Sequence, residues 1–151
     1  YAGVNERGDK STDSLEIGTD QLIPVCKPDA EGQPLFAFGA KDVQLPFLRF
    51  GDAAPIGAYL EPLFAAHGIL TRLYTVYENS MAGALRMRAR SGDGVAWLPK
   101  SLVAPDLEGG LLVRTGDANW YVDLSIRLYR DKKHSNRTTR AVWSFLQSHT
   151  N

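Results

Sequence analysis

Short apolar runs recur along the chain, and they are separated by stretches in which apolar residues lie three or four positions apart. The first pattern is typical of strands and the second of amphipathic helices. The strands predicted in this way are residues 20–26, 35–38, 46–50, 71–77, 95–99, 111–113 and 120–129, of which the last is the longest. The predicted helices are residues 52–67, 81–91, 101–107 and a final helix that begins after Ser135 or Asn136. Because strands and helices alternate, we predict an α/β fold, with a mixed sheet and helices on both of its faces.

Residues that favour turns and helix ends set the boundaries of these elements. Residues 1–19 are polar and rich in glycine, so a loop or a poorly tethered start of the chain is predicted there. Pro24 lacks an N–H group and predicts either an edge position for its strand or the end of the strand. Asp52 is suited to cap the helix that follows it, Pro62 predicts a kink or a late start in that helix, and Gly68 predicts its end. On the final helix, the residues predicted to share one face are Thr138, Val142, Phe145 and Leu146.

Composition excludes several classes of protein. Hydrophobic residues make up 44% of the chain and charged residues 23%, which is typical of a globular domain. The 17 basic and 17 acidic residues leave no net charge, so the chain has no overall field that would capture nucleic acid or an anionic membrane. No apolar run approaches the roughly 20 residues that a membrane span needs. Cys26 is the single cysteine, which excludes an internal disulfide and favours a reducing, cytoplasmic location.

The sequence also lacks the usual patterns of an enzyme. His67, His134 and His149 each stand alone, at a helix end or in a polar stretch. No G-x-S-x-G, H-E-x-x-H or Walker A pattern is present. Gly92 and Gly94 lack the third glycine and the preceding strand of a dinucleotide-binding fingerprint. We therefore expect no enzyme activity, no metal site and no cofactor.

The start of a helix that follows a strand offers the best candidate for a ligand site. Open α/β sheets bind ligands at the carboxyl ends of their strands, and the free N–H groups of a helix N-terminus attract anions. Met81 stands at such a start, directly after two polar residues. The predicted ligand site is a small cleft around Phe50, Asp52, Asn79, Ser80 and Met81.

Residues of this helix also have ordinary structural interpretations. Met81 shares an apolar arc with Ala84 and Leu85 and can simply pack in the core, and Met87 is interpreted as a packing residue. Arg88 falls on the apolar side, where it either extends over the edge of the core or faces a cleft and binds an acidic group. The neighbouring arginines that are predicted to point outward are Arg86 and Arg90.

Several segments, in their order and spacing, resemble one protein family. The run Glu78-Asn79-Ser80-Met81 leads to residues 92–99, where Gly92, Gly94, Leu98 and Pro99 hold the places of a G-x-G-hydrophobic-x-x-L-P segment. Across residues 18–149 the chain resembles the effector-binding domain of LysR-type transcriptional regulators. The other segments that carry this resemblance are residues 20–25, 109–113, 120–129 and 143–146.

The resemblance implies two α/β lobes, as in periplasmic binding proteins, with an effector between them. On this interpretation residues 25–117 form a complete second lobe, whereas residues 1–24 and 118–151 form part of the first. The family's N-terminal winged helix-turn-helix has no counterpart in these residues, so DNA would be bound only through an absent N-terminal domain. The expected partners are a small-molecule effector or an oxidant, together with a second copy of the chain or a full-length regulator subunit, and no membrane.

The run from Glu78 to Met81, together with the segments V-A-W-L-P and I-R-L-Y-R, resembles the hypochlorite-responsive branch of that family. In that branch methionine oxidation is the switch, which implies Met81 as the oxidant-sensing residue. Cys26 is a further candidate, although it has no resolving cysteine within the chain.

The predicted function is therefore an effector- or oxidant-sensing regulatory domain that controls transcription through oligomerisation. An incomplete first lobe would expose apolar surface on the strand 121–129 and on the helix that bears Trp143, which predicts a homodimer or a larger oligomer. The alternative function is a solute-binding protein of the periplasmic-binding type.

Overall fold

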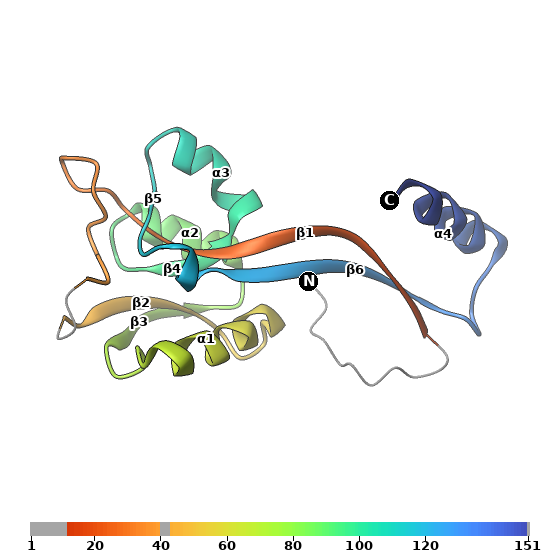
Figure 1. Ribbon diagram of the computed structural model, residues 1–151, viewed down its shortest axis with the longest axis horizontal. Helices are drawn as coiled ribbons and strands as arrows, with labels where there is room; N and C mark the ends of the chain where they lie inside the picture. Colours follow the sequence, from red (N-terminus) through yellow and green to blue (C-terminus); the bar gives the residue numbers. More distant parts are fainter. Residues whose placement is uncertain (1–11, 40–42, 151) are drawn as a thin grey trace. The chain divides into compact units, whose positions relative to one another are not determined.

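The chain forms two compact units to which the same two long strands contribute (Figure 1). The computed structural model describes residues 12–39 and 43–150. The larger unit comprises residues 20–123, and the smaller unit comprises the residues up to 19 and from 124 onward. The two strands that pair with each other and run through both units are β1 (Thr12–Cys26) and β6 (Val122–Asp131).

Strands of two sheets form the framework of the larger unit. In the first sheet, β1 lies between β4 (Ala96–Pro99) and β5 (Val113–Arg114) and is antiparallel to both. The second sheet is the parallel pair β2 (Leu45–Phe50) and β3 (Leu73–Asn79). Residues 22–26 of β1 are buried at every position, which explains why this part of the sequence is continuously apolar.

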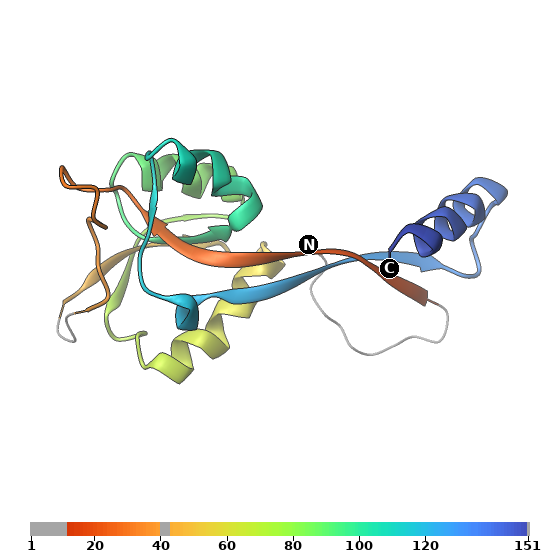
Figure 2. The ribbon, with the colours of Figure 1, turned by 45° about the horizontal axis from the view of Figure 1, so that its top comes forward.

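Helices follow β2, β3 and β4 and cover the sheets. They are η1 (Pro55–Tyr59) and α1 (Leu60–His67) after β2, α2 (Ala82–Arg90) after β3, and α3 (Lys100–Glu108) after β4. Figures 1 and 2 show α1 on one side of the β2–β3 pair and α2 on the other. The late helix start predicted from Pro62 is confirmed, because the 3-10 turn η1 precedes α1 and places the proline in the first turn of α1. Gly68 ends α1 with φ 60°, as predicted.

A close backbone contact joins the two sheets of the larger unit. Phe47 of β2 and Val95 form a parallel bridge. The Val95 N–H donates to the Pro46 carbonyl at 2.8 Å, and the Leu48 N–H donates to the Val95 carbonyl at 2.9 Å. A methyl group on Gly94 would lie 2.5 Å from the Pro46 carbonyl oxygen, far inside van der Waals contact. The joint between the sheets therefore requires glycine at this position.

An aromatic cluster fills the core of the larger unit. Trp97 of β4 is fully buried, and its Nε1–H donates to the carbonyl oxygen of Trp120 at 2.9 Å. Its ring lies 5.6 Å from Phe38, 5.9 Å from Phe47 and 4.8 Å from Phe64, measured between centroids. Each such ring pair stabilises a core by about 0.5–1.5 kcal/mol beyond the burial of its area. The cluster therefore ties together β2, α1, β4 and the loop that contains Phe38.

The smaller unit is a two-stranded ribbon followed by the helix α4 (Arg137–His149). The Arg130 guanidinium lies 4.6 Å from the ring centroid of Trp143, and it pairs with Asp13 at 2.8 Å. Hydrogen bonds from Lys132 and Arg130 hold the pKa of Asp13 below its usual value. One arginine therefore links both strands of the ribbon to the helix.

Two predictions about β1 need correction, one for its polar first residues and one for Pro24. The predicted loop is wrong for residues 12–19, which form the first half of β1, and residues 1–11 lie outside the described residues. Their polar side chains are satisfied across the ribbon, where the Ser125 hydroxyl donates to Glu16 at 2.6 Å. Of the two positions predicted from Pro24, the edge is wrong, because β1 is the central strand and the Pro24 carbonyl accepts a hydrogen bond from the Thr115 N–H at 3.0 Å. The strand end agrees with the structure, since β1 ends two residues later at Cys26.

Other strand predictions need smaller corrections. Residues 35–38 form bends and no strand. The longest strand is β1, with 15 residues, whereas β6 has 10. Trp120 lies in the short 3-10 helix η2 (Ala118–Trp120) before β6, and β5 begins only at Val113.

One predicted helix feature is wrong as well. Asp52 does not cap η1, whose N-cap is Ala54 with no side-chain hydrogen bond. On α4, Val142 and Phe145, which are predicted to share one face, are both exposed, whereas Trp143 is only 3% exposed. The cation–π contact with Arg130 explains this orientation, because it draws the tryptophan toward the ribbon. The cap predicted for α4 is confirmed at Asn136, whose side chain accepts a hydrogen bond from the Thr139 N–H at 2.8 Å.

Gly94→Ala is expected to lower the free energy of unfolding by about 2–3 kcal/mol, because the methyl group must force two backbone segments apart. Gly83→Ala is the matched control, since a methyl group there meets nothing within 4 Å and alanine favours the helix by up to about 1 kcal/mol. Urea unfolding followed by circular dichroism measures both. An unchanged stability for Gly94→Ala would contradict the proposed role of the contact.

Candidate functional site

The carboxyl ends of β2 and β3 lie side by side. Phe50 at the end of β2 is in register with Asn79 at the end of β3, and the Gly51 N–H donates to the Asn79 carbonyl at 3.1 Å. Phe50 is buried, whereas Ser80, which follows Asn79, is exposed. Parallel pairing therefore brings the segments that carry the predicted ligand site to one edge of the sheet.

Met81 occupies the N-cap position of α2. Its N–H donates to the Asn79 side-chain oxygen at 2.8 Å, and the Asn79 amide donates to the Tyr77 hydroxyl at 3.1 Å. The Met81 side chain is 71% exposed, so the predicted burial on an arc with Leu85 is wrong. The N-cap residue has extended backbone angles (φ −98°, ψ 119°), and its side chain does not follow the periodicity of the helix.

Asp52 is positioned by an arginine rather than by the helix after it. Arg49 contacts Asp52 at 2.7 Å and Glu78 at 2.5 Å. Hydrogen bonds to Asp52 and then to Glu78 raise the pKa of Arg49 above its usual value. Arg49 thereby connects the loop after β2 to Glu78 near the end of β3, beside the predicted ligand site.

A cavity of about 450 Å³ lies between the β2–β3 pair and the η1–α1 segment. Phe50 and Asp52 line it, but Asn79, Ser80 and Met81 do not. The structure therefore brings the five predicted residues to one edge of the sheet without placing them all in one cavity, and their role in binding stays a prediction. Residues of this cavity that sequence reasoning missed include Phe47, Arg49, Leu60, Glu61, Phe64 and Thr75.

The missed residues had a recognisable signal only on the helical side. Leu60, Glu61 and Phe64 recur with helical spacing, so one face of the helix was visible in the sequence. Which strand residues lie opposite that face depends on the pairing of β2 with β3, which the sequence does not specify. Phe47 and Thr75 therefore could not be assigned to the cavity.

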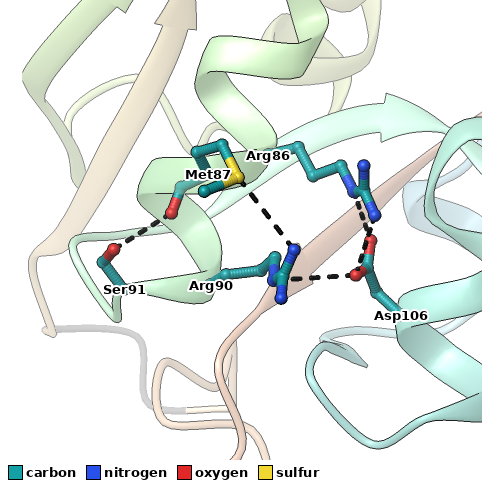
Figure 3. A network of polar contacts seen from close by, with 5 residues as sticks. All are labelled: Arg86, Met87, Arg90, Ser91 and Asp106. Atoms are coloured by element: carbon teal, nitrogen blue, oxygen red, sulfur yellow. Dashed lines mark hydrogen bonds and ion pairs between the residues drawn. The ribbon is translucent and has the colours of Figure 1, made fainter.

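The arginines of α2 are arranged differently from the prediction. Arg86 does not point outward, since it pairs with the buried Asp106 of α3 at 2.5 Å, and this hydrogen bond raises the pKa of Arg86. Arg90 lies 3.7 Å from the same carboxylate (Figure 3). Arg88 extends over the ring of Tyr77 at 4.7 Å and pairs with Asp93 at 3.1 Å, with about half of its side chain exposed. Met87 is 56% exposed, so its interpretation as a core residue is wrong.

The remaining candidate residues are accounted for by packing and local hydrogen bonds. Cys26 is fully buried, and burial raises the pKa of its thiol. His67 Nε2 lies 2.9 Å from the Asn119 carbonyl, and its ring stacks on Trp120 with centroids 4.1 Å apart. Among residues 12–39 and 43–150, no group of three or more His, Cys, Asp or Glu side chains could hold a metal ion. Within the same residues, no helix is long and apolar enough to cross a membrane.

Comparison with known proteins identifies the family. Residues 3–151 match the family described as LysR substrate binding domain. The chain belongs to this family. The membership agrees with the mixed α/β architecture and confirms the predicted fold class, a periplasmic-binding-protein-like regulatory domain of a LysR-type transcriptional regulator.

Individual relatives are consistent with this assignment. The LysR substrate binding domain is 25% identical over 135 residues to the HTH-type transcriptional regulator YjiE of Escherichia coli strain K12, covering 89% of this chain and 44% of the relative. It is equally similar to the HTH domain-truncated transcriptional regulator QseD of Escherichia coli O157:H7, of which it covers 54%. The chain thus spans about half the length of the curated relatives it matches.

A solved structure provides the comparison of the fold. The full-length structure of HypT from Salmonella typhimurium, described as a hypochlorite-specific LysR-type transcriptional regulator, superposes with a TM-score of 0.85 at 20% identity. The alignment covers 97% of this chain and 49% of that one. At this identity the likeness shows the fold alone.

Cys26 is expected to stay unmodified by iodoacetamide in the native protein at about pH 8 and to react fully in urea, because the thiolate is the reactive form and burial disfavours it. The neutral thiol stabilises the fold below its ordinary pKa of 9.0, and this contribution is lost as the pH rises through the raised value. Mass spectrometry of the peptide that contains Cys26 measures the modification. Rapid modification without denaturant would show that the thiol is accessible.

Proposed function

We propose that this LysR substrate binding domain senses an oxidant through Met81 and transmits the change through its assembly with another copy. The observation that carries the proposal is the exposure of Met81, whose side chain is 71% accessible at the N-terminus of α2. Cys26 is a weaker candidate, because its thiol is buried and its pKa is raised. The description of HypT as hypochlorite-specific supports the choice of oxidant.

The reaction of a thioether with hypochlorous acid requires no further reactant except water. The sulfur lone pair attacks chlorine and hydroxide leaves, which gives a chlorosulfonium ion. Water then adds to sulfur, and chloride and two protons leave, so that the product is methionine sulfoxide. The exposed sulfur of Met81 fits this chemistry, because oxidant and water can both reach it.

The position of Met81 suggests how the sulfoxide would alter the structure. The Ala84 and Leu85 N–H groups already bond to the Met81 carbonyl, but the first N–H groups of a helix have no partner within it. A sulfoxide oxygen is a strong acceptor, and the positive end of the helix dipole attracts it. It would compete with Asn79, whose side chain now accepts the Met81 N–H. Oxidation would therefore rearrange the junction of β3 and α2, beside the predicted ligand cleft.

A small-molecule effector is the second candidate signal. The cavity of about 450 Å³ has the size and the mixed apolar and polar lining that small-molecule sites need. It contains Phe50 and Asp52 of the predicted site. We retain the assignment of residues 25–117 to the second lobe, and of residues 1–24 and 118–151 to part of the first, as a proposal that follows from the family resemblance.

Association with a second copy is proposed from the smaller unit. Among its described apolar residues only Leu124 and Trp143 are buried, which is little for a ribbon and one helix. Val142 is 51% exposed and Phe145 61% exposed on α4. Exposed apolar side chains of this kind are typical of an interface with another protein surface. Val142 and Phe145 are therefore the proposed contacts on the helix that bears Trp143.

Graded hypochlorite is expected to oxidise Met81 at a lower dose than Met87, because Met81 is more exposed and the Met87 sulfur contacts Arg90 at 4.0 Å. Peptide mass spectrometry measures the dose at half oxidation. Oxidation is expected to shift the amide NMR signals of Ala82 and Gly83 in the native protein and in Met87→Leu, but not in Met81→Leu. Met81→Gln is expected to mimic the oxidised state. Met81 is excluded as the sensor if hypochlorite shifts the Ala82 and Gly83 signals fully in Met81→Leu, or if it shifts them in the native protein while Met81 is still reduced.

Static light scattering is expected to show a dimer or a larger oligomer. Phe145→Glu should weaken the self-association constant about ten- to hundredfold, since an interfacial phenylalanine contributes roughly 1.5–3 kcal/mol when buried. Leu35→Glu is the matched control, because Leu35 is also exposed but belongs to the larger unit. A strict monomer at high concentration, or equal weakening by both substitutions, would contradict an interface on α4.

A further inference from the structure

The buried carboxylate of α3 is neutralised by one arginine of α2. The Asp106 side chain is only 2% exposed. Arg86 donates to its two oxygens from Nε at 2.5 Å and from Nη2 at 3.1 Å. A bidentate arginine satisfies a carboxylate in charge and in hydrogen bonding. Asp106 therefore needs no second cation.

A second arginine is nevertheless held next to this pair. The Arg90 Nε lies 3.7 Å from Asp106, beyond hydrogen-bond distance, and its Nη1 lies 4.0 Å from the sulfur of Met87, which is a weak acceptor (Figure 3). Two guanidinium groups share one carboxylate in this cluster. One positive charge of the cluster therefore remains uncompensated, and it lies on Arg90, which forms the weaker contacts.

Arg90 and a second cation, Lys27, line a pocket of about 400 Å³. Lys27, from the end of β1, lines the same pocket, and no carboxylate does. No described carboxylate forms an ion pair with Lys27. The Lys27 stem passes close to Gly92, where a methyl group would lie 3.2 Å from the lysine Cδ, so the stem is seated against the turn that ends α2.

The other walls of the pocket are partly apolar. Met87 is 56% exposed and Leu111 is 47% exposed, and both line the pocket together with Pro28. The C-terminal end of α2 attracts cations, which favours the presence of both Lys27 and Arg90 in this pocket. That attraction uses no acidic side chain, so Lys27 keeps its hydrogen-bond donors for a ligand, and Arg90 has only its two weak contacts to exchange for one.

We propose that this pocket binds a small organic anion, a carboxylate joined to a short apolar body. The carboxylate would lie between Arg90 and Lys27, and the apolar body would contact Met87 and Leu111. Arg86 would keep Asp106 neutralised when Arg90 turns to the ligand, so that the link between α2 and α3 survives binding. This site lies apart from Met81 and from the larger cavity beside β2, and it does not depend on the proposed oxidant function.

The test titrates the full chain with hexanoate and follows backbone amides by two-dimensional NMR. Saturable shifts are expected at Ser91, Gly110 and Leu111, which line the pocket. Hexanol, which lacks the charge, and inorganic phosphate, which lacks the apolar body, are expected to bind at least about tenfold more weakly. Raising the salt concentration is expected to weaken the binding of hexanoate, because the pocket is partly open to solvent.

Single substitutions test whether hexanoate binds through this pocket or through the overall charge of the protein. Arg90→Gln and Lys27→Gln are each expected to weaken hexanoate binding about three- to tenfold, and circular dichroism checks that each variant folds. Arg88→Gln is the matched control, since it removes the same charge from the same helix outside the pocket. Equal effects of all three substitutions, shifts spread over the surface, or phosphate binding as tight as hexanoate would overturn the proposal.

Discussion

The larger unit depends on the backbone contact between Gly94 and Pro46. Without a side chain at Gly94, the strand that begins at Val95 can approach β2 closely enough for the Val95 N–H to reach the Pro46 carbonyl. This contact connects the β2–β3 pair with the sheet that contains β1 and β4. The aromatic cluster around Trp97 forms across the same connection, since Phe47 comes from β2 and Trp97 from β4. The cavity beside Phe50 is therefore positioned by a contact at the opposite end of β2.

Local sequence patterns predicted those elements whose burial is decided by their own residues. β2 and α3 have apolar residues and stop signals close together in the chain, and both were predicted within a few residues. Residues 12–19 behave differently, because Asp13, Ser14 and Glu16 have their side-chain partners on β6, more than a hundred positions away. Taken alone these residues have the composition of a loop. Their strand exists only through cross-strand pairing, which single-sequence patterns do not contain.

Only part of the candidate site was predictable from the sequence. The ends of β2 and β3 could be expected at one edge because parallel strands share their direction, and the register of Phe50 with Asn79 agrees with this. The exposure of Met81 was not predictable from the helical wheel, since the residue belongs to the cap and not to the helix. The arginines of α2 were misplaced for another reason. A buried Asp106 on a different helix decides which way Arg86 and Arg90 turn, and nothing near them in the sequence announces it.

The stack of His67 on Trp120 has an optical consequence. The fluorescence of an indole ring depends on the groups in van der Waals contact with it. The ring of Trp120 lies 4.1 Å from that of His67, while Trp97 is enclosed by phenylalanines, and Trp143 belongs to the smaller unit. The emission of Trp120 therefore depends on its stack with His67, a contact that the other two tryptophans do not make. Changes in the contact between α1 and η2 can therefore be followed by tryptophan fluorescence, without an attached label.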